Sequence, residues 1–98
     1  MGYLELKVRG LAIVKKNGML LENLPASLRR DRDIVLEAVK QDGWALYYAE
    51  KGLNNDPEIV KAAVTKCGEV LYFASKERQD DREIVQKAVK QYGGALEF

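Results

Sequence analysis

The feature that most constrains this chain is a unit that recurs at a spacing of 25 residues. Self-similarity at a fixed period of this length is the signature of proteins built from stacked copies of one supersecondary unit. Residues that recur in such a protein mostly serve packing, so they are a structural signature first. The recurring residues are Asp31, Asp56 and Asp81 at the start of the unit, Gly43, Gly68 and Gly93 in its middle, and Leu46, Leu71 and Leu96 in its second half.

Each copy is predicted to fold as a pair of helices. In the copy that opens at Asp31, apolar residues at i, i+1, i+4 and i+5 form one helical stripe that begins at Ile34. Asp31 is placed to cap the first helix, and Gly43 is expected to end it with a positive φ, as is Gly68 in the next copy. The expected helices are Leu6–Lys16, Met19–Asn23, Arg32–Asp42, Trp44–Glu50, Pro57–Cys67, Glu69–Ser75 and Arg82–Tyr92.

The predicted fold is all-α, a short α-solenoid of helix-turn-helix pairs, because helices this short are marginal without neighbours. We expect one repeat domain over residues 1–98. It divides into a degenerate copy at 6–30, two full copies at 31–55 and 56–80, and a truncated copy at 81–98. The truncated copy should leave an apolar face, which predicts self-association through the C-terminal repeat or covering by a further repeat.

Composition excludes several classes of function. The chain has 98 residues with 16 basic and 15 acidic side chains, a balance that argues against a dedicated nucleic-acid binder. It lacks histidine, the usual general base and commonest zinc ligand, and its one cysteine, Cys67, cannot form an internal disulfide. No apolar run approaches the ~20 residues that span a bilayer. We therefore expect a cytoplasmic protein that is not an enzyme, with no catalytic residue, cofactor, metal or membrane contact.

Charged residues gather at the ends of the predicted helices. Acids stand at the helix starts and lysines in the last turns, where each complements the helix dipole. One interpretation is that these charges form a solvated edge that only complements the helix dipoles. The alternative is that the lysines form a basic strip that binds an acidic partner. The last-turn lysines are Lys15, Lys16, Lys40, Lys66 and Lys90.

Three aromatic residues are candidates for binding a partner. Trp44, Tyr47 and Tyr72 occupy positions that hold Met19 and Glu22 in the first copy, so packing does not dictate them. Trp and Tyr dominate the energetics of protein interfaces. Partial structural burial and a partner-binding patch both stay open. Tyr48 and Phe73 recur more strictly and are assigned to packing between copies.

The recurring text resembles a known family. It is similar to the repeat called domain of unknown function 4116, with the pattern Asp-x-Glu/Asp-Ile-Val-x-x-Ala-Val-x-x-x-Gly-x-x-Leu-x-Tyr/Phe-Ala. The pattern is found at 31–49, at 56–74 and at 81–96. The resemblance implies a tandem helical repeat and carries no catalytic residue, cofactor or activity. Proteins of this kind often come from protists and from bacteria that live inside other cells. The resemblance thus implies a role at a host–bacterium interface, with delivery into a host cell if the source is such a bacterium.

The leading functional hypothesis is a helical-repeat module for protein–protein interaction or spacing, because stacked helix pairs form extended surfaces. The alternative is a substrate-positioning accessory segment of a larger enzyme or bacterial effector. A third class, repeats that read one RNA base each, needs base-facing side chains at a fixed offset. Positions 40, 65 and 90 carry Lys, Thr and Lys, so no such code is evident.

Overall fold

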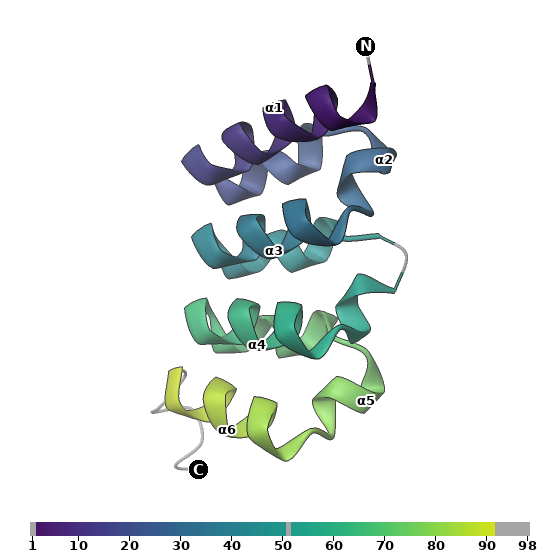
Figure 1. Cartoon of the computed structure of the whole chain (residues 1–98). Helices are drawn as coiled ribbons and strands as arrows, with labels where there is room; N and C mark the ends of the chain where they lie inside the picture. Colours follow the sequence, from purple (N-terminus) through teal and green to yellow (C-terminus); the bar gives the residue numbers. More distant parts are fainter. Residues whose placement is uncertain (1, 51, 92–98) are drawn as a thin grey trace.

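The computed structural model describes residues 2–50 and 52–91, and every regular element within these ranges is a helix, which confirms the all-α class. The longer helices lie side by side in one column, and 3₁₀ helices form a second column beside it (Figure 1). The α column consists of α1 (Tyr3–Lys16), α3 (Arg32–Gln41), α4 (Pro57–Lys66) and α6 (Arg82–Gln91), and the 3₁₀ column of η1 (Gly18–Asn23), η2 (Gly43–Tyr48) and η4 (Gly68–Phe73).

Short segments return the chain from the 3₁₀ column to the next α helix. They are α2 (Ala26–Arg29), η3 (Leu53–Asn55) and α5 (Lys76–Gln79). Backbone hydrogen bonds join successive returns, from Glu50 N to Arg29 O at 3.1 Å and from Ser75 N to Asn54 O at 3.0 Å. The result is an elongated stack of 53 × 24 × 17 Å. The signature residues Gly93 and Leu96, and the end of the predicted helix at Tyr92, lie outside the described residues.

The aspartates cap the α helices as predicted. One carboxylate oxygen of Asp56 accepts from the amides of Glu58 at 3.0 Å and Ile59 at 3.3 Å. Asp31 and Asp81 accept from the amides two and three residues on in the same way. These bonds satisfy amides that have no partner inside the helix.

The prediction that the recurring glycines end their helices with a positive φ is wrong. Among the described glycines only Gly52 has a positive φ, of 71°. The helices end instead at extended residues such as Asp42, with φ −151°. A Cβ added at Gly43 would lie 2.4 Å from the carbonyl oxygen of Ala63, on the next α helix. Glycine is required because the backbone of the following unit lies against it.

The second helix of each pair is a 3₁₀ helix that begins at the glycine, rather than the longer helices predicted over Trp44–Glu50 and Glu69–Ser75. Asp42 shows why the turn is tight. Its carboxylate accepts from Trp44 N at 3.0 Å, and its carbonyl accepts from Ala45 N at 3.0 Å, an i to i+3 bond. The expected start of the first helix is also corrected, because α1 begins at Tyr3 instead of Leu6.

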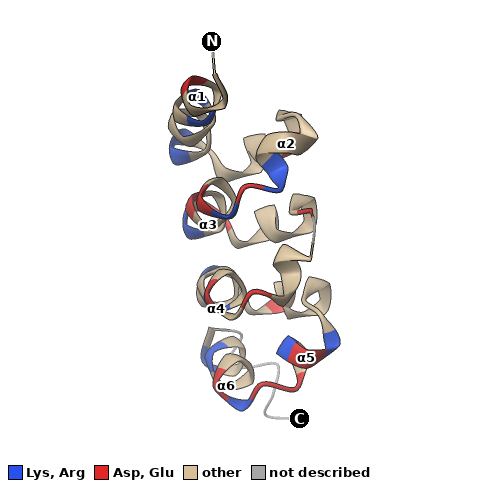
Figure 2. Cartoon of the chain, turned by 45° about the vertical axis from the view of Figure 1, so that its right-hand side comes forward, with Lys and Arg blue, Asp and Glu red and all other residues tan. Residues whose placement is uncertain are grey.

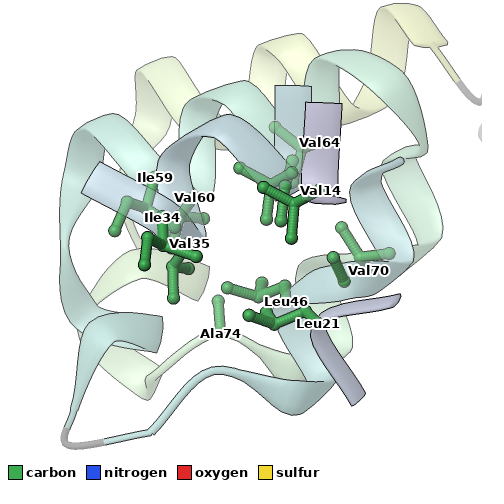
Figure 3. Packing of buried hydrophobic residues seen from close by; sticks show 14 of the residues in the cluster. Val14, Leu21, Ile34, Val35, Leu46, Ile59, Val60, Val64, Val70 and Ala74 are labelled. Atoms are coloured by element: carbon green, nitrogen blue, oxygen red, sulfur yellow. The ribbon is translucent and has the colours of Figure 1, made fainter. Parts of the chain in front are cut away.

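The core lies between the two columns, where side chains from both interdigitate (Figure 3). The predicted stripes of α3 and α4 are fully buried, whereas Val85 and Val89 of α6 are half-buried. No buried polar or charged residue occurs within the described part of the chain. Hydrophobic burial therefore stabilises the stack, and a middle unit gains it from both sides. The stripes are Ile34, Val35, Ala38 and Val39 on α3, and Ile59, Val60, Ala63 and Val64 on α4.

Candidate protein-interaction surface

The geometry of η2 aligns two of the candidate aromatic residues. A 3₁₀ helix has three residues per turn, so side chains at i and i+3 lie one above the other. Gly43 and Leu46 accordingly face the core and are buried. Trp44 and Tyr47 share an outward side, where they are 37% and 61% exposed.

These side chains line a shallow hollow together with residues from the neighbouring units. Phe73 of η4 lies between Trp44 and Tyr47, with ring centroids 5.6 Å and 5.1 Å away, both edge to face. Tyr48 packs edge to face on Tyr47 at 5.2 Å. Such geometry is the favoured one for aromatic pairs. We call this feature the aromatic hollow; it is lined by Met19, Trp44, Tyr47, Tyr48 and Phe73.

The structure brings together only part of the predicted set. Tyr72, the third candidate, is 87% exposed and makes no ring contact within the described residues, although it adjoins Phe73 in the chain. Met19, Tyr48 and Phe73 line the hollow and were not predicted as site residues. The recurrence of Tyr48 and Phe73 was the available signal, but it indicated packing between copies. Phe73 does pack across copies, and it lines the hollow as well.

Charge is distributed unevenly between the two columns (Figure 2). The helices η1, η2 and η4 contain no lysine or arginine, and their charged residues are Glu22 and Glu69. Burial raises the pKa of Tyr48, and the nearby Glu22 carboxylate raises that pKa further. Glu69 stands one unit beyond Trp44, with its carboxylate 3.6 Å from the Cys67 sulfur. The two acidic residues of the 3₁₀ column therefore lie on the helices that flank η2.

The α column carries both signs of charge, arranged as ion pairs between successive helices. Lys7 Nζ lies 3.4 Å from Asp31 and 2.7 Å from Asp33. Arg32 pairs in the same way with Asp56 and Glu58 of the next helix, and Lys61 of α4 with Glu83 of α6. The acids at the helix starts thus hold neighbouring units together in addition to capping. The last-turn lysines are exposed, and a basic strip for an acidic partner stays a prediction.

Across residues 2–50 and 52–91, no group of three His, Cys, Asp or Glu side chains could hold a metal ion. Cys67 is half-buried, and burial raises the pKa of its thiol, which keeps the thiolate scarce near neutral pH. Of the helices that the structure describes, none is both long and apolar enough to cross a membrane.

The fold and this surface define an all-α protein made of stacked helical units, with an exposed aromatic face on its 3₁₀ helices. The sequence profile described as Domain of unknown function (DUF4116) matches residues 11–54 and 56–98, and the chain belongs to that family. The second matched segment begins at Asp56, the cap of α4. The first segment includes α3 with η2, and the second includes α4 with η4 as well as α6. No curated protein and no solved structure matched the chain.

Proposed function

We propose that this chain is a non-enzymatic module that binds another protein through the aromatic hollow and the adjoining Tyr72. The observation that carries the proposal is the exposure of Trp44 and Tyr47, aligned on one side of η2 around Phe73. Trp and Tyr supply large contact areas with few rotatable bonds, which makes them the commonest interface hot spots.

The exposed rings are not needed to complete the core. Behind them, Ala45 and Leu46 are already buried against the α column. The first unit holds Met19 and Glu22 where η2 holds Trp44 and Tyr47, so the fold accepts a charged residue there. A partner that covered the rings would gain about 25 cal/mol for each Å² of apolar surface removed from water.

The test compares capture of partners by the wild-type chain, by a triple variant of the aromatic residues and by a double variant of α1. Trp44→Ser, Tyr47→Ser and Tyr72→Ser together should abolish capture of a partner that the wild type enriches. The matched control is Leu4→Ser with Val8→Ser, which removes exposed apolar side chains, 74% and 58% accessible, from α1. Circular dichroism checks that both variants stay helical.

Two results would reject the proposal: a partner retained by the aromatic variant, or one lost equally in the α1 control. Binding that occurs only to another domain of the same polypeptide would instead favour an accessory segment of a larger enzyme or effector. We also propose a cytoplasmic location, with delivery into a host cell if the source is an intracellular bacterium. Fractionation of cells that express a tagged chain tests this location.

A further inference from the structure

We propose that the aromatic hollow recognises an arginine side chain, presented by an otherwise apolar peptide segment of the partner. This inference rests on the proposed function and adds the chemistry of the ligand. The guanidinium would lie over Tyr47 and Tyr48, at the end of the hollow nearest Glu22. The apolar neighbours of the arginine would cover Trp44 and Phe73.

The hollow offers a surface that suits a planar cation. Its lining is aromatic apart from the Met19 thioether. The faces of Trp and Tyr rings attract cations, and the planar guanidinium stacks on them better than an ammonium does. The edge-to-face contacts of Tyr47 with Phe73 and Tyr48 fix the orientation of the rings before a ligand arrives. A preorganised surface loses less entropy when it binds.

The charges of the 3₁₀ column complement a cation. Glu22 lies on η1 and Glu69 on η4, the helices that flank η2, and η1, η2 and η4 carry no basic residue. Within the described residues, neither carboxylate takes part in an ion pair. Burial raises the pKa of the Tyr48 hydroxyl, and the Glu22 carboxylate raises it further, so negative charge acts at the Tyr48 end of the hollow. A cation is therefore attracted to this end of the hollow, and an anion is repelled.

Several basic residues that the structure describes lie away from this end of the hollow or are already paired. Lys40 and Lys66 lie in the last turns of α3 and α4, where the chain enters η2 and η4, at the opposite end from Tyr48. On the return segment α2, Arg29 is already paired with Glu50. The Tyr48 end of the hollow thus combines aromatic faces with a carboxylate and favours arginine over an acidic or neutral ligand.

The experiment uses the fluorescence of Trp44, the one tryptophan of the chain, as the signal. Three short Leu–Ser peptides that differ only at a central residue are titrated into the full chain: arginine, its neutral isostere citrulline, and glutamate. The arginine peptide should bind about fivefold to tenfold more tightly than the citrulline peptide. That ratio should fall as salt is raised and in the Glu22→Gln variant. Glu37→Gln on α3 is the matched control and should leave the ratio unchanged.

Equal binding of the arginine and citrulline peptides, or no binding of either, overturns the inference. Tighter binding of the glutamate peptide, or dimerisation of the chain through the hollow in light scattering, overturns it as well. The proposed function fails separately. If a captured partner depends on Trp44 and Tyr47 but the peptides show no preference for arginine, the interaction surface stands and the arginine chemistry is wrong.

Discussion

Arg32 of α3 forms an ion pair with Asp56, the residue that caps α4, with 2.5 Å between the arginine Nε and a carboxylate oxygen. The same carboxyl group accepts from the amides of the first turn of α4. Lys7 of α1 meets Asp31, the cap of α3, in the same relationship one unit earlier. One aspartate in each of these units therefore starts its own helix and ties it to the helix before.

The dual role of Asp56 predicts a larger loss of stability than a surface ion pair would give. Asp56→Ala should lower the free energy of unfolding by about 1–2 kcal/mol, because it removes the cap along with the ion pair. Glu58→Ala removes only an exposed partner of Arg32 and should cost clearly less. Urea denaturation of both variants measures the difference. Equal losses would show that Asp56 acts as an ordinary surface charge.

The aspartate caps also predict a dependence of stability on pH. Burial opposes ionisation of Asp31, but hydrogen bonds from Tyr3, the Ile34 and Asp33 amides and Lys7 lower its pKa below the ordinary value. The pKa of Asp56 is lowered in a similar way. A carboxyl group with a depressed folded pKa contributes stability above its unfolded pKa of about 3.9. That contribution is lost as the pH falls through the folded value.

The check is a series of thermal melts from neutral pH down to below about pH 4, where the wild type should lose stability. Asn caps a helix about as well as Asp but does not titrate. The double variant Asp31→Asn, Asp56→Asn should therefore show a shallower loss over the same range. An unchanged slope would mean that other carboxyl groups account for the acid sensitivity.

Gly43, which contacts the next helix, and Gly52, which has a positive φ, should differ in their tolerance to substitution. Gly43→Asn should cost about 3 kcal/mol or more, because even the Cβ would collide with the Ala63 carbonyl of α4. Gly52 has a positive φ and open space around its Cβ position, so Gly52→Asn should cost about 1 kcal/mol or less. Chemical denaturation compares the two variants. Comparable small losses would indicate that Gly43 provides a turn and not a close contact.

The centre of the stack should be the part most sensitive to cavities. Ile59 is fully buried on α4, between α3 and α6, and Ile59→Ala should cost about 2–5 kcal/mol. Leu4→Ala removes a side chain that is 74% exposed on α1 and should change stability little. Melting curves that shift equally for both variants would contradict the stacked core.

Much of the local structure could be predicted from the residues themselves. Asp31 and Asp56 precede apolar stripes with helical spacing, and both the caps and the burial of those stripes depend on neighbours only a few positions away. Two residues of the aromatic hollow could be singled out from the sequence. Trp44 and Tyr47 stand out because other copies hold different residues there, whereas Phe73 resembles a packing residue and its position between the two rings depends on the distance between units.

The amino-acid sequence by itself determined that this chain is helical, where the helices that follow Asp31, Asp56 and Asp81 begin, and which residues recur. The tertiary structure alone decided what the recurring glycines do and how the second helices wind. A glycine permits both a positive φ and a close backbone approach, and the residues around Gly43 do not distinguish the two. The position of the Ala63 carbonyl distinguishes them, because this carbonyl lies against Gly43 only when two units stack. The same contact fixes where η2 begins, and its threefold winding places Trp44 above Tyr47.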